Sequence, residues 1–218
     1  MAAKIAGEPA VSVGVCGDGA TSEGDFNEAL NFAGVFQAPV VLVVQNNGWA
    51  ISLPRNKQSA APSFAARGAG FGVPAHLVDG NDILAVYSTM QKAVERARAG
   101  QGPSLIETLT YRMGAHTTAD DPTRYRDAAE IEAWKRKDPI ERFQKFLLQR
   151  DLLSGKEIET LLTEIEDEIN VAVQVAENTP DMAPDSFFDY ATAELTPRLQ
   201  EQRAELLRQV NEKRQGEK

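Results

Sequence analysis

Three short segments of this 218-residue chain are mainly apolar and rich in β-branched side chains: residues 11–15, 40–45 and 104–110. Glycine or proline bounds each of them, a pattern typical of strands that are buried on both faces. Between the first two segments, residues 24–37 carry apolar side chains at helical spacing. The order strand, helix, strand therefore opens the chain. The apolar face of the helix consists of Phe26, Ala29, Leu30, Ala33 and Phe36.

A second helix is predicted over residues 83–99, with Gly100 after it as a stop signal. Strands that are apolar throughout and alternate with helices are typical of a mainly parallel sheet covered by helices. We therefore predict an α/β fold of this kind for residues 1–126. His76 precedes a further short apolar strand and is interpreted as structural. The inner face of the second helix is predicted to consist of Leu84, Val86, Tyr87, Met90, Ala93 and Val94.

The second part of the chain, residues 127–218, is almost purely helical in pattern and is predicted to be a helical C-terminal extension. The formal charge also changes at this boundary, from −1 over residues 1–126 to −8 over the remainder. Asp138 and Pro139 are an N-cap and a first-turn proline, which predicts a helix over residues 140–150.

A long amphipathic helix is predicted next, because Ser154 and Glu157 have the spacing of a capping box. Pro180 and Pro184 end it, and Thr196 followed by proline opens a polar final helix that ends near residue 216. Acidic helices of this sort are interpreted as solvated faces. The apolar positions of the long helix are Ile158, Leu161, Leu162, Ile165 and Ile169.

Composition excludes several classes of protein. Hydrophobic residues make up 42% and charged residues 25%, which indicates a globular chain. A net charge of −9 argues against binding of nucleic acid through phosphate neutralisation, and the longest apolar stretch, residues 38–44, is too short to cross a membrane. Cys16 is the single cysteine and the first residues lack a signal-peptide pattern, so we predict a reducing, cytoplasmic setting.

The chemistry of the chain is concentrated where the first strand ends, in the turn Gly17, Asp18, Gly19. Glycines let the backbone turn sharply and approach a ligand closely. The turn leads into a helix, so free N–H groups near residues 20–22 are predicted to receive phosphate oxygens. Asp18 is predicted to hold a cation at the same place.

A second polar loop, residues 45–49, follows the next strand and contains Asn47. Asn47 lies 29 residues after Asp18, the length of one strand-helix-strand unit, so both loops are expected at one edge of the sheet. Mg²⁺ takes oxygen ligands and completes its shell with phosphate and water. Asp18, Asn47 and a backbone carbonyl are therefore predicted to supply one face of a Mg²⁺ site.

These motifs also have other interpretations. Asp-Gly and Asn-Gly are common turn dipeptides, and each by itself is ordinarily a plain turn. Gly17, Gly19 and Ser22 approach the dinucleotide fingerprint, but serine replaces its third glycine and no acidic residue ends the second strand. A P-loop is excluded because the chain contains no Gly-Lys-Ser or Gly-Lys-Thr.

A Gly-Asp-Gly turn followed at this distance by Asn-Asn is similar to the thiamine-diphosphate signature, and residues 10–150 resemble the α subunit of the decarboxylating component of 2-oxo acid dehydrogenase complexes. The resemblance implies the thiamine-diphosphate-binding fold and an incomplete N-terminal end. Further segments match that family in order and spacing: residues 46–52 (NNGWAIS), 78–82 (VDGND), 102–107 (GPSLIE) and 111–122 (YRMGAHTTADDP).

The resemblance implies two cofactors, thiamine diphosphate and Mg²⁺. It implies that Mg²⁺ is ligated by Asp18, by the side chain of Asn47 and by the backbone carbonyl of Trp49. The diphosphate would meet the backbone at Gly17, Gly19 and Ala20.

The same resemblance places Ile51 beside the aminopyrimidine end of the cofactor. It makes residues 110–126 a loop that closes the active site and brings His116 to the reacting carbon. Histidine suits proton transfer near neutral pH, so His116 is the predicted catalytic residue. By itself, a lone histidine in such a loop would be interpreted as solvent-facing or structural.

Three arginines of the loop, Arg112, Arg124 and Arg126, are candidates for ordering the loop or for steering a substrate carboxylate, with surface ion pairing as the alternative. Thr117 stands where some relatives carry a regulatory phosphoserine. Its phosphorylation is a hypothesis, in which the added negative charge would oppose loop closure over an anionic substrate.

The resemblance implies oxidative decarboxylation of a small 2-oxo acid, with acyl transfer to a lipoyl group on an acyltransferase core protein. It implies a β subunit that completes a heterotetramer and supplies the glutamate that activates the cofactor, so the chain should be inactive alone. Pyruvate is the predicted substrate and branched-chain 2-oxo acids are the runner-up.

Family α subunits have a sizeable segment before the Gly-Asp-Gly turn, and this chain resembles an N-terminally truncated member. The first strand is therefore expected to expose an apolar edge. Two alternatives stay open: a non-catalytic remnant that only binds partner subunits, and a transketolase-like transferase. The loop around His116 argues against the transferase.

Overall fold

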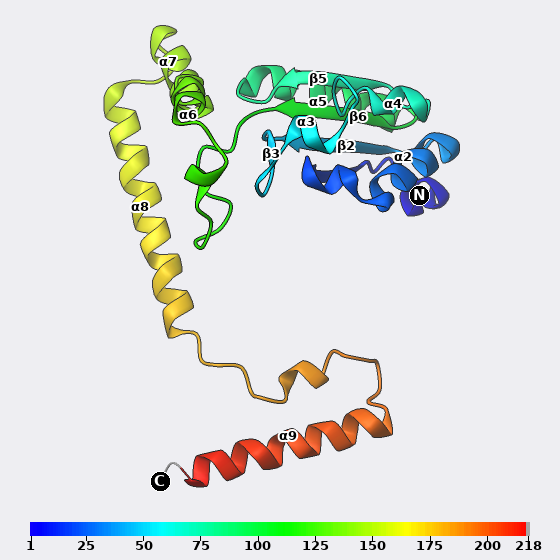
Figure 1. Cartoon of the computed structure of the whole chain (residues 1–218), viewed down its shortest axis with the longest axis vertical. Helices are drawn as coiled ribbons and strands as arrows, with labels where there is room; N and C mark the ends of the chain where they lie inside the picture. The colour runs from blue at the N-terminus through cyan, green and yellow to red at the C-terminus, as the bar shows by residue number, and fades with distance from the viewer. Residues whose placement is uncertain (217–218) are drawn as a thin grey trace. The chain divides into compact units, whose positions relative to one another are not determined.

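The computed structural model of the chain describes residues 1–216. The chain divides into two compact units, Met1–Ser154 and Gly155–Lys218. The first unit contains the sheet and its covering helices, and the second consists of helices and their connections (Figure 1). Among the described residues, no helix is long and apolar enough to cross a membrane.

A parallel sheet of four strands forms the centre of the first unit. Its strands are β1 (Ser12–Gly17), β2 (Val40–Asn46), β5 (Ala75–Asp79) and β6 (Ser104–Leu109). They lie in the order β1-β2-β6-β5, and every neighbouring pair is parallel. The predicted α/β fold with a mainly parallel sheet covered by helices is therefore confirmed.

All three predicted strands are present, with ends that differ by no more than two residues. A fourth strand, β5, includes His76 and not only the residues after it. The sequence pattern did not predict the short hairpin of β3 (Trp49–Ala50) and β4 (Leu53–Pro54). Two residues per strand are too few to produce a recognisable alternation.

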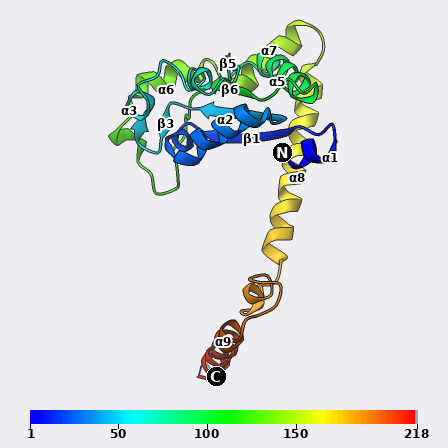
Figure 2. The ribbon, with the colours of Figure 1, turned by 90° about the vertical axis from the view of Figure 1, so that its right-hand side faces the viewer.

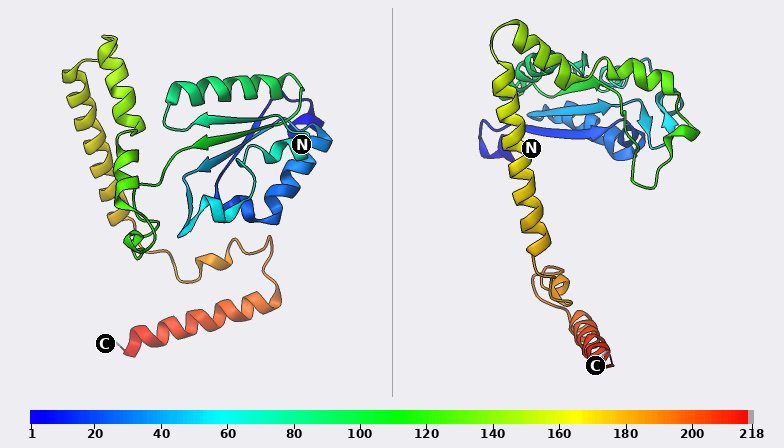
Figure 3. Two further views of the ribbon diagram at one scale, coloured as in Figure 1. Left: turned by 45° about the horizontal axis from the view of Figure 1, so that its top comes forward. Right: turned by 90° about the vertical axis from the view of Figure 1, so that its left-hand side faces the viewer.

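Helices cover the two faces of the sheet (Figure 3). The predicted helices over residues 24–37 and 83–99 are confirmed as α2 (Gly24–Phe36) and α5 (Ile83–Arg98). Asp82 caps α5, since its carboxylate accepts hydrogen bonds from the N–H groups of Leu84 and Ala85. The short helical elements of the unit are α1 (Ala2–Ala6), η1 (Gly19–Ser22), α3 (Arg55–Gln58), α4 (Arg67–Gly70) and η2 (Pro122–Arg124).

The core is split by the sheet into two clusters. On one face Leu30 of α2 packs with Val44, Phe64, Val73 and Leu105, all of which are at most 2% exposed. On the other face the buried members are Val41, Val43, Ala93 and Ile106. Because side chains alternate along a strand, neighbours such as Leu105 and Ile106 serve opposite clusters.

Parts of the predicted helix faces are wrong. Phe36 of α2 is 47% exposed, and Ala29 is exposed as well. In α5, Leu84 and Tyr87 are 48% and 66% exposed. The helix is buried at Ala93 and Ala97, farther along the chain. Periodicity identifies the apolar stripe of a helix, but the length of stripe that is covered depends on the neighbouring elements.

Strand β1 is an edge strand (Figure 2). Among the described residues it pairs only with β2, and its Val13 and Val15 are 48% and 59% exposed. The expected apolar edge is present. Such an edge offers unpaired backbone groups beside apolar side chains.

The helices α6 (Ala128–Lys135) and α7 (Pro139–Gln149) belong to the first compact unit, although they lie beyond the predicted boundary at residue 126. The boundary marks the change from α/β to helical structure, and the compact unit continues to Ser154. Asp138 caps α7 as predicted, because its carboxylate accepts hydrogen bonds from the first-turn N–H groups.

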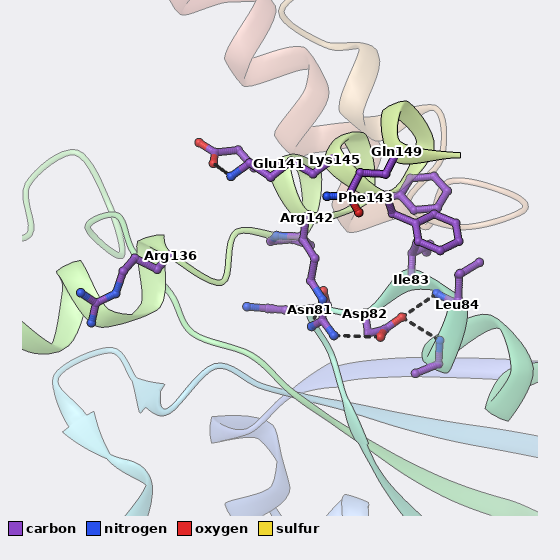
Figure 4. A pocket seen from close by; sticks show the side chains of 13 residues that line it. Asn81, Asp82, Ile83, Leu84, Arg136, Glu141, Arg142, Phe143, Lys145 and Gln149 are labelled. Carbon is purple, nitrogen blue, oxygen red and sulfur yellow. Dashed lines mark hydrogen bonds and ion pairs between the residues drawn. The ribbon is translucent and has the colours of Figure 1, made fainter. Parts of the chain in front are cut away.

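Arg142 of α7 attaches this helix to the sheet region. Its guanidinium lies 2.7 Å from an Asp79 carboxylate oxygen and 3.0 Å from one of Asp82. The hydrogen bond from Arg142 holds the pKa of Asp79 below its ordinary value. Figure 4 shows Arg142 extending toward Asp82 along a pocket of about 470 Å³, where Phe143 points toward Ile83.

The second unit contains α8 (Gly155–Asn178), η3 (Ser186–Phe188) and α9 (Pro197–Gly216), which confirms the predicted helices and the break between them. No residue of α8 is buried. Within this unit, Arg203 of α9 forms ion pairs with Asp185 at 2.8 Å and with Asp189 at 3.2 Å. The predicted capping box at the start of α8 stays a prediction.

Replacing a core side chain of α2 should destabilise the first unit far more than replacing an exposed one. We expect Leu30→Ala to lower the free energy of unfolding by about 2 to 5 kcal/mol, because Leu30 is fully buried. Val35→Ala on the same helix, 68% exposed, should change it by less than about 0.5 kcal/mol. Urea denaturation of both variants measures the difference, and equal losses would contradict this packing.

Candidate functional site

The candidate site forms where β1 and β2 end side by side. Gly17 pairs with Gln45 in the parallel register, and the N–H of Asp18 donates to the Gln45 carbonyl at 3.2 Å. Asp18 therefore lies beside the start of the second polar loop, as the sequence predicts. Its side chain is 1% exposed. Gln58 of α3 donates a hydrogen bond to the Oδ2 atom of Asp18 at 2.8 Å.

The turn after Asp18 is one turn of 3₁₀ helix, η1, and α2 begins only at Gly24. Thr21 donates both its N–H and its hydroxyl to the Asp18 carbonyl, at 3.1 and 2.7 Å. The prediction that the N–H groups near residues 20–22 are free is therefore wrong for Thr21. A Cβ atom on Gly19 would come within 2.9 Å of the Ala50 Cβ atom, so only glycine lets this turn approach the hairpin so closely.

The second loop presents Asn47 in a tight turn. Gly48 has a positive φ of 85°, and the Oδ1 atom of Asn47 accepts a hydrogen bond from the Trp49 N–H at 3.1 Å. Ile51 also has a positive φ, of 55°, which is unfavourable for a β-branched residue. Backbone strain of this kind is concentrated at functional sites, which accords with the predicted role of Ile51 at the cofactor.

The predicted closing loop is attached to this hairpin by Arg112. Its Nη1 donates to the Trp49 carbonyl at 3.3 Å, and its Nη2 donates to the Ile51 carbonyl at 2.5 Å. The backbone pairs as well, since the N–H of Arg112 donates to the Asn47 carbonyl at 3.2 Å. One side chain thus joins the loop to two of the predicted cofactor-binding residues.

His116 lies in an exposed part of the same loop. Its Nδ1 is 3.5 Å from the Nη1 of Arg112, and its backbone N–H donates to Asp120 at 2.8 Å. The Tyr125 hydroxyl donates to the same Asp120 oxygen at 2.5 Å and accepts from Arg112 at 3.1 Å. These bonds bring His116 to the hairpin that carries Trp49.

The three arginines of the loop have different roles. Arg112 and Arg126 order the loop, and Arg126, 8% exposed, donates to the carbonyls of Arg112, Met113 and Gly114. The side chain of Arg124 forms no such bond among the described residues. Thr117 is exposed, and its phosphorylation stays a hypothesis.

The residues present fit a magnesium diphosphate group. Asp18 offers a buried carboxylate whose Oδ1 accepts no hydrogen bond from the described residues, and the Oδ1 of Asn47 accepts only one. Carboxylate, amide and carbonyl oxygens are the ligands that Mg²⁺ prefers. The described chain has no group of three or more His, Cys, Asp or Glu side chains that could hold a metal alone. Phosphate oxygens would therefore have to complete the coordination.

A pocket of about 360 Å³ lies beside the turn and is lined by Cys16, Ala20 and Glu23, among others. Of the predicted site residues only Ala20 lines it. Burial, followed by the neighbouring Asp18 charge, raises the pKa of the Cys16 thiol, which disfavours the reactive thiolate. The larger pocket of Figure 4 lies elsewhere and contains none of the predicted site residues.

Two side chains near the site were missed by the sequence analysis. Gln58 bonds to Asp18 across 40 residues, and Glu107 bonds to Asn46 across 61. Gln58 gives no sequence signal. Glu107 gives one, since it is an acidic residue in the middle of an otherwise mainly apolar strand.

The sequence of the chain is similar to those of known proteins. Residues 1–185 match the family described as dehydrogenase E1 component. The chain is 50% identical over 209 residues to the 3-methyl-2-oxobutanoate dehydrogenase subunit alpha of Mycobacterium tuberculosis, which covers 94% of this chain and 56% of that protein. It is 44% identical over 200 residues to the pyruvate dehydrogenase E1 component subunit alpha of Staphylococcus epidermidis, covering 91% and 54%.

The fold and the site together define a class of α/β proteins, in which a parallel sheet carries a polar site at the carboxyl ends of its strands. Within that class, the chain belongs to the dehydrogenase E1 component family. The chain spans about half the length of the curated relatives it matches.

The bond between Tyr125 and Asp120 should be visible in the titration of Asp120. That hydrogen bond, and then the one from the His116 N–H, hold the pKa of Asp120 below its ordinary value. The contribution of these hydrogen bonds to the stability of the fold is therefore present at pH values above the ordinary carboxyl pKa. It is lost as the pH falls through the lowered pKa of Asp120. We expect Tyr125→Phe to raise the pKa of Asp120, measured by carboxyl ¹³C NMR. An unchanged pKa would contradict the network.

Proposed function

We propose that this chain acts as the cofactor-binding α subunit of a 2-oxo acid dehydrogenase, with thiamine diphosphate and Mg²⁺ at the site around Asp18. The observation that supports it best is the meeting of three elements: a buried carboxylate, the Asn47 turn and a histidine loop attached to the same hairpin by Arg112. Membership of the dehydrogenase E1 component family supports the same activity.

Each site residue has a separate task in this proposal. Asp18, the Oδ1 of Asn47 and the backbone carbonyl of Trp49 would ligate Mg²⁺. The backbone near Gly17, Gly19 and Ala20 receives the diphosphate, and Ile51 lies beside the aminopyrimidine.

Thiamine diphosphate, when bound, supplies the nucleophile and the electron sink for removing carbon dioxide from a 2-oxo acid. The Nδ1 of His116 lies 3.5 Å from the guanidinium of Arg112, and its Nε2 makes no hydrogen bond with the described residues. A proton held on Nε2 can be donated to the oxo oxygen of the substrate as charge develops there. Arg112 and Arg126 keep the loop in the shape that presents this nitrogen.

The substrate we propose is a branched-chain 2-oxo acid such as 3-methyl-2-oxobutanoate, with pyruvate as the second candidate. This order reverses the one expected in the sequence analysis, where pyruvate came first and branched-chain 2-oxo acids second. Identity is 50% to a relative named for 3-methyl-2-oxobutanoate, against 44% and 43% to two named for pyruvate. We propose two partners. A β subunit forms a heterotetramer with this chain, and a lipoyl-bearing acyltransferase core receives the acyl group.

Binding of thiamine diphosphate should require Mg²⁺ and the charge of Asp18. We expect Asp18→Asn, which keeps the shape of the side chain, to weaken Mg²⁺-dependent binding by more than about tenfold. Calorimetric titration of the chain with its β subunit measures this, with and without Mg²⁺. Asp167→Asn on the exposed face of α8 is the matched control and should bind as the unmodified chain does. A folded complex without any Mg²⁺-dependent binding would contradict the cofactor proposal and favour a non-catalytic remnant.

Substrate preference should follow the closer relatives. With the β subunit and cofactors present, we expect decarboxylation of 3-methyl-2-oxobutanoate at a kcat/KM at least about tenfold above that for pyruvate, because one or two methylene groups in a fitted pocket discriminate by that order. Release of carbon dioxide from each labelled acid measures both values. The reverse order would assign the chain to pyruvate, and turnover of neither would contradict the proposed activity.

A further inference from the structure

Glu107 is a buried carboxylate in the centre of the sheet. It lies on β6, is 1% exposed and points to the same face as Leu105, in the cluster that contains Phe64. Among the described residues, Asp18 is the only other acidic side chain buried to this extent. An apolar residue would fill this position at a lower desolvation cost, so the carboxylate needs a separate explanation.

Both oxygens of Glu107 accept a hydrogen bond from a loop next to the candidate site. Oε1 accepts from the Asn46 side-chain amide at 2.7 Å, and Oε2 accepts from the Ala65 backbone N–H at 2.7 Å. Only an acceptor at both oxygens satisfies both donors, which is the hydrogen-bonding pattern of a carboxylate.

Asn46 connects Glu107 to the turn that contains Asn47. It is 3% exposed, and while its Nδ2 donates to Glu107 its Oδ1 accepts from the Gly48 N–H at 3.1 Å. Glu107 therefore determines which way the amide of Asn46 faces, and the amide in turn holds the backbone on both sides of Asn47.

The second hydrogen bond of Glu107 comes from the Ala65 N–H. Ala65 lies in the segment between α3 and α4, and α3 ends with Gln58, which donates to Asp18. The Nε2 of Gln58 also donates to the Leu53 carbonyl at 3.2 Å, while its Oε1 atom is buried without a hydrogen-bond partner among the described residues. The two oxygens of Glu107 thus reach both sides of the candidate Mg²⁺ site.

We propose that Glu107 is a positioning residue that holds the Asn47 turn and the Gln58 segment in register around the Mg²⁺ site. The part of this inference that concerns Mg²⁺ rests on the proposed function. The part that concerns the positions of the two loops rests on the hydrogen bonds of the structure alone. The proposal assigns a role to a residue that touches neither the metal nor the cofactor.

Glu107→Gln tests this, because an amide cannot accept at both of its ends. Either its NH₂ group faces the Ala65 N–H, or Asn46 turns over and the Gly48 N–H loses its acceptor. We expect the Mg²⁺ affinity of the thiamine-diphosphate complex to fall by about 10 to 100 fold, as for other residues that orient metal ligands. In the chain without cofactor, hydrogen–deuterium exchange of the Gly48 or Ala65 amide should become faster.

A rescue variant separates positioning from general packing. Combining Glu107→Gln with Asn46→Asp moves the carboxylate to position 46, where it can accept from both the new amide and the Gly48 N–H, while the new amide oxygen accepts from Ala65. The double variant should regain the Mg²⁺ affinity lost by either single change. Ile106→Val, a neighbour on β6 that faces the opposite cluster, is the control for lost packing and should bind Mg²⁺ normally.

Wild-type Mg²⁺ affinity in folded Glu107→Gln, or a folded double variant without recovery, would overturn the inference. If Glu107→Gln does not fold, Asn46→Ala keeps the carboxylate and removes both bonds of the Asn46 amide, the one to Glu107 and the one from the Gly48 N–H, and the same loss is expected. If the unmodified chain binds no thiamine diphosphate, the proposed function fails by itself, and exchange at Gly48 and Ala65 still decides whether Glu107 holds the loops.

Discussion

Parallel pairing of β1, β2 and β6 positions every part of the candidate site. The register sets Gly17 against Gln45 and Asn46 against Leu109, so three chain segments leave the sheet at one edge. Pairing continues past the last strand residues, since the Thr110 N–H donates to the Asn46 carbonyl at 2.9 Å. Residues that are far apart along the chain thereby become neighbours without any direct attraction between their side chains.

Two carboxylates are buried near this edge, and they differ in what satisfies them. Glu107 is satisfied by donors of the protein at both oxygens, whereas only one oxygen of Asp18 accepts such a bond among the described residues. Burial of a carboxylate is unfavourable unless it is compensated. The first group is therefore complete as folded, and the second has the remaining capacity that a cation would fill.

The sequence predicted the elements that have a long repeating pattern. The strands, α2, α5 and the helices of the second part all follow from periodicity, capping residues and proline positions. The hairpin at Trp49 is too short to have a period, and the exposure of Leu84 and Tyr87 depends on how far neighbouring elements extend. Contacts such as that of Arg142 with Asp79 span 63 residues and leave no local trace. Gly-Asp-Gly and Asn-Asn marked the site. Glu107 stands out in the sequence as an acidic residue in a mainly apolar strand, but its bond to Asn46, like that of Gln58 to Asp18, is visible only in three dimensions.

The pairing of Asn46 with Glu107 also bears on how this sequence can change over generations. A mutation at either position leaves a buried polar group of the other without its partner, which is costly, while an exchange of amide and acid between the two positions preserves every bond. Related sequences that differ at positions 46 and 107 should therefore carry both replacements together. In a large family, the two columns would be statistically dependent even though neither residue contacts the chemistry.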